Sequence, residues 1–333
     1  MKRSRLLAFA CCALVLAALQ PDVLAQAKKQ KAESKREIRT RRISSILKES
    51  FEYKFGTPVE KGVALEYSEF NPSGKQVVAE EYDDGRLVKR TISKYNSSGN
   101  KIEEAVYDQD TLLASRTTYA YDARGNATEE MKFDRDSAMT EKTSRRYDAA
   151  GNKVEEIRYD GDGEIKAKIA FTYDGAGRLT EADHLNAEGE LQSKNKYAYD
   201  AKGKKTEEIA YDRNGEIEAK TNLKYDTNGN LLSQSTYDSD GSLAERLEYV
   251  VDNDGNVVEY AKFKSDGHLV VRERFKTDNQ DRRIEVRVFD SEDHFQTRTV
   301  FSYDQSGTLE KEIEHNILDE PARMIKYTIK YYP

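Results

Sequence analysis

Residues 147–173 read Tyr-Asp-Ala-Ala-Gly-Asn-Lys-Val-Glu-Glu-Ile-Arg-Tyr-Asp-Gly-Asp-Gly-Glu-Ile-Lys-Ala-Lys-Ile-Ala-Phe-Thr-Tyr. This stretch contains one motif twice: an aromatic residue, Asp, two variable residues and Gly. Asp is favoured at the first position of a type I turn, because its carboxylate accepts a nearby backbone N–H. Gly three residues later adopts the left-handed conformation that closes a bulged hairpin. The motif therefore predicts two tight turns, joined by a strand at 153–159 and followed by a second strand at 165–173.

The pattern inside the second strand supports a half-buried sheet. All odd positions from Ile165 to Tyr173 are apolar or aromatic, as one buried face requires. Pairing Tyr159 with Ile165 across the turn places Glu156 opposite Lys168. The same register predicts the pairs Glu104–Arg116, Glu130–Lys142 and Glu208–Lys220. Such pairs contribute roughly 0.2–1 kcal/mol each, so they set the register more than the stability.

The motif recurs every 26 residues along most of the chain. The first aromatic series is Tyr95, Tyr121, Tyr147, Tyr173, Tyr199 and Tyr225, continued at Val251, Thr277 and Tyr303. The second series, 12 residues behind, is Tyr107, Phe133, Tyr159, Leu185, Tyr211, Tyr237, Phe263, Phe289 and His315. We therefore expect an all-β protein with about ten repeats of two hairpins, the last two atypical. The predicted fold is an antiparallel β-meander or solenoid of about 20 short strands, in an open or partly curled sheet.

The stretch Tyr173-Asp174-Gly175-Ala176-Gly177-Arg178-Leu179-Thr180 resembles the consensus of the bacterial RHS/YD repeats, and 225–231 is close to it. The resemblance covers roughly residues 70–310. It implies an exported or cell-surface protein whose repeats form a long antiparallel strip that curls. In some members such repeats are implicated in carbohydrate binding, and the large members encapsulate a C-terminal toxin. The period of 26 is longer than the family's, and no toxin domain precedes Pro333, so we do not expect encapsulation.

The N-terminus has the pattern of a secretory signal peptide over residues 1–25. Lys2, Arg3 and Arg5 precede an apolar stretch at 6–19, and we expect cleavage after Ala25. The protein is then exported: secreted, periplasmic or at the cell surface. Both cysteines, at positions 11 and 12, lie in the removed segment, so we expect no disulfide bond.

A basic segment follows the predicted cleavage site. Residues 26–50 hold nine Lys or Arg and three Glu, and Ile43, Ile46 and Leu47 have helical spacing. Two interpretations of residues 26–55 remain: a short capping helix that covers the first strand, or a solvated basic linker. Residues 56–333 form the predicted repeat domain.

Composition excludes several classes of protein. The formal net charge of −7 argues against a globally basic nucleic-acid binder. Strands that span a membrane need about 9–11 residues and an uninterrupted apolar band. Here every second predicted strand has about seven residues and both faces carry charges, so we expect no membrane-spanning segment. We expect a monomer.

Two repeated features could form a binding surface. A carboxylate column shares a face with aromatic residues: Glu103, Glu129, Glu155, Glu181, Glu207, Glu259 and Glu285. It is either a solvated rim or a binding stripe for a cation or a hydroxyl-rich ligand. The tyrosine columns are either the packed face of the sheet or a platform on which sugars stack.

No candidate for catalysis or metal binding emerges. The loops 160–163 and 252–255 invite a calcium interpretation, but neither has the ligand spacing of an EF-hand, and turn chemistry explains both. The histidines at 184, 268, 294 and 315 occupy different repeat positions. We therefore expect no enzyme, no cofactor and no catalytic or metal-binding residue, and the ligand-binding residues stay undefined.

These observations favour a non-catalytic exported repeat protein that binds a ligand at the cell envelope or outside the cell, with a polysaccharide as the first candidate. One alternative is a protein-interaction scaffold at the cell surface or in the periplasm, which holds its partner by strand addition at exposed strand edges and through its charged face. A second, less favoured, is a glycan hydrolase.

Overall fold

The computed structural model describes residues 42–333, which fold entirely into antiparallel β-strands and turns. The predicted signal peptide and residues 26–41 of the basic segment lie outside the described residues. The strands are β1 (Ile43–Lys54), β2 (Thr57–Pro58), β3 (Val63–Phe70), β4 (Gln76–Asp83), β5 (Arg86–Tyr95), β6 (Lys101–Asp108), β7 (Leu113–Tyr121), β8 (Ala127–Asp134), β9 (Met139–Tyr147), β10 (Lys153–Asp160), β11 (Ile165–Tyr173), β12 (Leu179–Leu185), β13 (Leu191–Tyr199), β14 (Lys205–Asp212), β15 (Ile217–Tyr225), β16 (Leu231–Asp238), β17 (Leu243–Val251), β18 (Val257–Lys264), β19 (Leu269–Thr277), β20 (Arg283–Phe289), β21 (Phe295–Tyr303), β22 (Leu309–His315) and β23 (Pro321–Tyr331).

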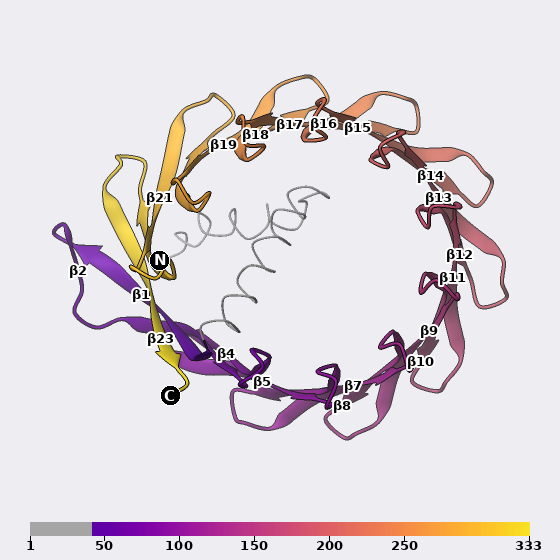
Figure 1. The fold of residues 1–333 in the computed structure, drawn as a ribbon, viewed down its shortest axis with the longest axis horizontal. Helices are drawn as coiled ribbons and strands as arrows, with labels where there is room; N and C mark the ends of the chain where they lie inside the picture. Colours follow the sequence, from indigo (N-terminus) through magenta and orange to yellow (C-terminus); the bar gives the residue numbers. More distant parts are fainter. Residues whose placement is uncertain (1–41) are drawn as a thin grey trace, which may run out of the picture.

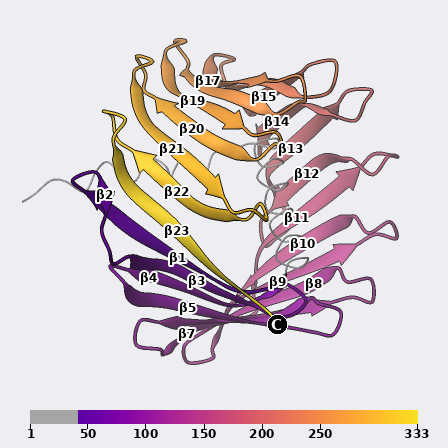
Figure 2. The same cartoon turned by 60° about the vertical axis from the view of Figure 1, so that its left-hand side comes forward.

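The sheet closes into a barrel, shown along its axis in Figure 1 and from the side in Figure 2. Strands β3 to β23 pair in chain order, and β1 lies between β3 and β23, which gives 22 strands in the closed sheet. The all-β antiparallel prediction is confirmed, but the open or partly curled sheet is wrong. Closure pairs both edges of the strip, which would otherwise expose unsatisfied backbone N–H and C=O groups.

Strand β1, which closes the barrel, replaces part of the predicted helix or linker. Ile46 pairs with Ile329 on one side and with Ser68 on the other. A bulge between Ile43 and Ser45 interrupts the alternation of period two in this strand. Ile43, Ile46 and Leu47 therefore have the spacing of a helix although they lie in a strand. The strand also lacks the turn motif of the repeats, so the sequence pattern did not mark it as a strand.

The turns have the predicted chemistry. Asp148 Oδ1 accepts a hydrogen bond of 2.8 Å from the Asn152 backbone N–H, and the Gly151 N–H donates one of 3.1 Å to the Asp148 carbonyl. Gly151 has a φ of 90°, in the region that favours glycine. At the equivalent position of other turns, Thr111 and Ser137 adopt φ values of 62° and 65° despite having side chains.

The predicted cross-strand ion pairs are wrong by one residue. Tyr159 does pair with Ile165, but the register shifts directly after this pair, so Glu156 lies opposite Ile169 rather than Lys168. The same shift follows every turn of the repeats, because one strand carries an extra residue there. The neighbouring glutamate takes the basic partner instead: Glu103 with Arg116 at 3.8 Å, Glu129 with Lys142 at 2.6 Å and Glu207 with Lys220 at 2.5 Å.

The two faces of the sheet differ in burial. Side chains converge on the concave side of a closed sheet and are therefore more buried there than on the convex side. Gln234 and Leu247 lie directly opposite each other and are 1% and 2% exposed, and their face also carries Arg145 and Glu156. We take this face as the inner face of the barrel, and the face with Glu129, Lys142 and Tyr159 as the outer face.

The apolar core of the described residues is small. One cluster on the inner face gathers Leu223, Leu231, Leu247, Tyr249 and Tyr260 from β15 to β18. Elsewhere most strand residues are half-buried, as expected where one sheet layer has no second layer packed against it. The part of the chain that the structure describes has no helix long and apolar enough to cross a membrane.

Candidate ligand-binding face

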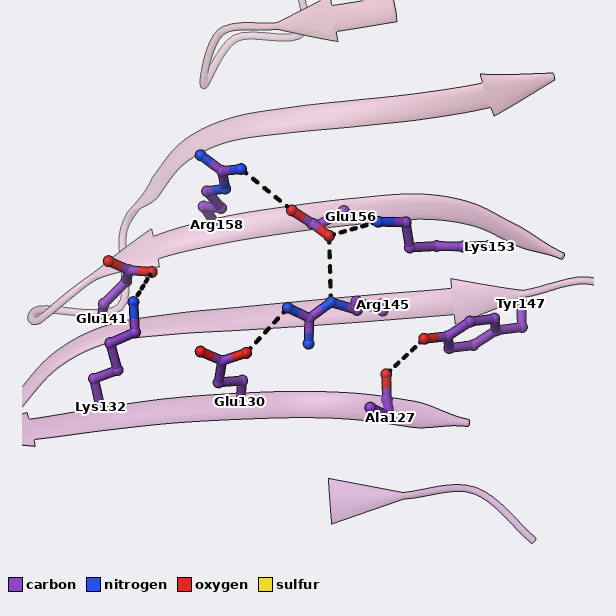
Figure 3. A network of polar contacts seen from close by, with 9 residues as sticks. All are labelled: Ala127, Glu130, Lys132, Glu141, Arg145, Tyr147, Lys153, Glu156 and Arg158. Carbon is purple, nitrogen blue, oxygen red and sulfur yellow. Dashed lines mark hydrogen bonds and ion pairs between the residues drawn. The ribbon is translucent and has the colours of Figure 1, made fainter. Parts of the chain in front are cut away.

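The two aromatic series lie on opposite faces, which the sequence did not predict. The first series points inward and serves the fold: the Tyr147 hydroxyl donates a hydrogen bond of 2.8 Å to the carbonyl of Ala127, across the open end of hairpin β8–β9 (Figure 3). The bond recurs at Tyr95, Tyr121, Tyr173, Tyr199, Tyr225 and Tyr303. The packed-face interpretation therefore holds for this series.

Cations cover several of these inner rings. The Arg178 guanidinium lies 5.0 Å from the ring centre of Tyr199, and Arg282 lies 4.5 Å from that of Tyr303. Burial raises the pKa of both tyrosine hydroxyls above their ordinary value. Rings held by a backbone hydrogen bond and a stacked cation have little surface left for a ligand.

A polar network crosses three strands on the inner face (Figure 3). Arg145 lies between two carboxylates, 3.1 Å from Glu130 and 3.2 Å from Glu156, and Glu156 also binds Lys153 at 2.8 Å. Burial alone would raise the pKa of Glu156, but hydrogen bonds from Lys153 and Arg145 outweigh it and hold the pKa below its usual range. This network joins β8, β9 and β10, and we assign it a structural role.

The predicted carboxylate column lies on the outer face, beside the second aromatic series. Its glutamates bind the basic column in most repeats: Glu103–Arg116, Glu129–Lys142, Glu181–Lys194, Glu207–Lys220, Glu259–Arg272 and Glu285–Arg298. Glu155 is the exception and binds Arg146 at 2.8 Å. The column is thus neutralised by partner cations, which argues against a binding stripe for free cations.

The second aromatic series also lies on the outer face, where its members before His315 are half-buried. Cations lie over some rings, as Arg116 does over Phe133 at 4.4 Å and Lys142 over Tyr159 at 5.8 Å. The hydroxyls of Tyr211 and Tyr237 have no hydrogen-bond partner within residues 42–333. Unlike the first series, these rings are not held by the backbone, so their polar tips can bind a ligand.

Two shallow grooves open on the outer face. One, of about 220 Å³, is lined by Lys220, Asn222 and Tyr237 among others. The other, of about 290 Å³, lies over β17 to β20, and its lining includes Arg274 and Phe289. Each groove contains one ring of the second series, next to hydrogen-bonding side chains.

The two loops considered as calcium sites behave as turns, and the histidines lie apart from one another. Asp160 Oδ1 accepts backbone hydrogen bonds from Asp162 and Glu164, and Asp252 does the same in its own turn, so the turn interpretation of both loops is confirmed. His184 lies in β12 and His315 ends β22. Over residues 42–333 no group of three or more His, Cys, Asp or Glu side chains is placed to hold a metal ion.

Comparison with known proteins identifies no family for the whole chain. A family model described only as an uncharacterised protein matches residues 136–228, less than a third of the sequence, and it is not the RHS/YD-repeat family. No curated protein matches.

Solved structures with a similar arrangement include parts of large toxin complexes. The Tc holotoxin pore of Photorhabdus luminescens matches 78% of this chain with 14% identity and a TM-score of 0.42. The TcdB2-TccC3 complex matches 78% with 14% identity and a TM-score of 0.43. This chain spans only 16% and 17% of these proteins. A porin-like protein from Bacteroides uniformis matches 86% of this chain and 98% of its own, at 11% identity and a TM-score of 0.33.

Proposed function

We propose that this protein is a non-catalytic, exported binding protein whose outer face holds a polysaccharide at the cell envelope or outside the cell. The observation that carries the proposal is that both grooves open on the outer face and each contains a ring of the second series, Tyr237 or Phe289. Flat rings beside hydrogen-bonding side chains are the usual means of holding sugars, which present apolar faces and polar edges.

The spacing of the rings suits an extended ligand. Equivalent strands of adjacent repeats lie two strands apart, which is roughly 10 Å. That is about the length of two linked hexose rings, so one glycan chain can meet rings of consecutive repeats. Tyr211 and Tyr237 are the first such pair to test, because their hydroxyls are unoccupied within the described residues.

The chemistry of Glu181, one member of the glutamate column, supports binding rather than hydrolysis. A glycoside hydrolase needs a carboxylic acid whose pKa is raised, so that it can protonate the leaving group. At Glu181, the hydrogen bond from Lys194 lowers the pKa instead. We call the outer-face column of glutamates together with its paired Lys and Arg residues, Arg116 to Arg298, the ionic ladder. This ladder leaves no uninterrupted apolar band for lipid, which supports a protein that does not span a membrane.

The protein-scaffold alternative loses one of its two means of binding. Strand addition needs a free sheet edge, and in the described barrel β1 is paired on both sides, with β3 and β23. A protein partner would therefore have to bind the charged outer face.

The test is retention of the purified protein on a panel of insoluble polysaccharides and on cell envelopes with and without protease treatment. Retention on a purified glycan, weakened at least tenfold by Tyr211→Ala with Tyr237→Ala, supports the proposal. Leu185→Ala is the matched control, because it changes the same repeat position without removing a ring. Retention only on envelopes, and its loss after protease treatment, would overturn the polysaccharide proposal in favour of a protein partner.

A further inference from the structure

The larger outer groove has cations that the repeat does not require. Its lining includes Arg274 and Lys276 from β19 and Arg287 from β20, together with Glu259 and Glu285. At the position of Arg287 no other repeat carries a cation: the equivalents are Ala105, Met131, Ile157, Asp183, Ile209, Ser235, Ala261 and Ile313. Most repeats fold with a small or apolar side chain there, so the fold does not need this guanidinium.

The two other cations depart from the pattern to different degrees: one of the repeats compared has a cation at the position of Arg274, and three have one at the position of Lys276. The equivalents of Arg274 are Thr118, Ser144, Ala170, Lys196, Asn222, Glu248 and Val300. The equivalents of Lys276 are Lys94, Ala120, Arg146, Thr172, Ala198, Lys224, Val250 and Ser302. Only in this groove do all three positions carry a cation. In a repeat protein, residues that leave the common pattern together at one place indicate a local task beyond folding.

The cations outnumber the carboxylates that could neutralise them. Glu285 is shared by Lys276 at 3.0 Å, Arg287 at 2.8 Å and the ladder residue Arg298 at 3.8 Å. Glu259 is shared in the same way by Arg274 at 2.8 Å and by Arg272 at 3.2 Å. Arg272 and Arg298 each have a second carboxylate partner, Asp293 and Asp319 respectively. Arg274, Lys276 and Arg287 have only Glu259 and Glu285 between them, three cations to two carboxylates.

The cations remain accessible. The side chains of Arg274, Lys276 and Arg287 are 47%, 60% and 40% exposed, so solvent or a ligand reaches all three. The Arg274 guanidinium lies 4.8 Å from the ring centre of Phe289. This contact orients the N–H groups of the guanidinium over the groove.

We propose that Arg274, Lys276 and Arg287 bind the carboxylate groups of an acidic polysaccharide, with the Phe289 ring as the apolar floor of the groove. This inference rests on the proposed function and specifies its ligand class. Guanidinium groups bind carboxylates through two parallel hydrogen bonds, and Lys adds a mobile positive charge. An anionic ligand is favoured because Arg274, Lys276 and Arg287 share only Glu259 and Glu285, which leaves one positive charge without a carboxylate partner of its own.

The test compares two forms of one polymer, polygalacturonate and its methyl ester, which differ only in whether the carboxylates are free. We expect the purified protein to bind the free acid at least tenfold more tightly, with an affinity that falls as salt is raised. Replacing Arg274→Ser, Lys276→Thr and Arg287→Ile together should weaken binding of the acid at least tenfold and leave binding of the ester unchanged. Each new residue occurs at the same position of another repeat, at Ser144, Thr172 and Ile157, so the variant should fold.

The matched control removes three exposed cations from the inner face, by Lys89→Thr, Lys132→Thr and Arg158→Thr, and should leave the affinity within twofold. Circular dichroism and thermal melting establish that all variants are folded. If the ester binds as well as the acid, or the outer-face variant keeps full affinity for the acid, the inference fails while the proposed function stands. If neither these polymers nor any other polysaccharide is bound, both fail.

Discussion

The hydroxyl of Tyr147, at the end of β9, donates a hydrogen bond to the carbonyl of Ala127, at the start of β8, over a distance of 2.8 Å. The bond fastens the open end of one hairpin, opposite to its turn, and equivalents occur in six other repeats. A tyrosine that recurs at this position therefore contributes to the register of the sheet as well as to its packing.

Removing this hydroxyl should destabilise the barrel. We expect Tyr147→Phe to lower the free energy of unfolding by about 1 kcal/mol, the usual contribution of one hydrogen bond. Tyr237→Phe is the control, because the Tyr237 hydroxyl has no partner among residues 42–333. The urea midpoints of the two variants measure the difference. Equal midpoints would mean that the bond contributes nothing.

The turn at Thr111 should be improved by glycine. Thr111 has a φ of 62°, a conformation that costs a residue with a side chain roughly 1–2 kcal/mol. Thr111→Gly should therefore raise the thermal midpoint. The reciprocal change, Gly163→Thr at the equivalent position two repeats later, should lower it, although a Cβ atom on Gly163 would meet nothing within 4 Å. If the thermal midpoint rises in one variant and falls in the other, the effect comes from the backbone conformation and not from steric contact.

The inner-face network should depend on its central arginine. Arg145 is 19% exposed and binds two carboxylates, so Arg145→Ala leaves both Glu130 and Glu156 with fewer partners. We expect a loss of about 2 kcal/mol. Arg158→Ala removes a side chain that is 55% exposed and should cost less than about 1 kcal/mol. Chemical denaturation compares the two, and equal losses would argue against a structural role for the network.

Acid should destabilise the barrel through its turns. The hydrogen bond from the Asn152 side chain and that from the Asn152 backbone hold the pKa of Asp148 below its ordinary value, and Asp226 and Asp174 are lowered in the same manner. A carboxylate whose pKa is lower in the folded state stabilises the fold above its unfolded pKa, and this contribution disappears as pH falls. We expect stability to be nearly constant from about pH 7 to 5 and to decrease below about pH 4.

The measurement is the urea midpoint as a function of pH. Asp148→Asn removes one of these titrating groups and should make the decrease below about pH 4 shallower, while the midpoint at neutral pH falls slightly. A midpoint that is independent of pH down to about pH 3 would contradict the role assigned to the turn carboxylates.

How much of the structure could be predicted depends on which residues carry a local signal. Tyr147, Asp148 and Gly151 specify a turn by their own chemistry, so the strands of the repeats, their order and the turn bonds were correctly predicted, whereas β1, which lacks this motif, was not. The pairing of Glu156 was not, because the extra residue that follows each turn has no distinctive side chain. Closure of the sheet was missed because the contacts of β1 with β23 join opposite ends of the chain.

The candidate site was less predictable. The two aromatic series have the same kind of residue and the same period, and only the bulges place Tyr147 inside and Tyr159 outside. The cations of the large groove could have been found by comparing equivalent positions, since Arg287 replaces alanine or isoleucine in five of the other repeats, but no property of one repeat alone marks it.

The seam between β1 and β23 has a consequence for the order of events during synthesis. A ribosome produces β1 and β3 almost together, so β1 can pair with β3 early. The backbone groups on the other edge of β1 stay unpaired until β23, the last strand, has been made. During elongation the growing sheet has two edges with unpaired backbone N–H and C=O groups. One is always at β1, and the other is at the strand that formed most recently. Release of an incomplete polypeptide would leave both edges open, so premature termination should yield self-associating products rather than shorter rings.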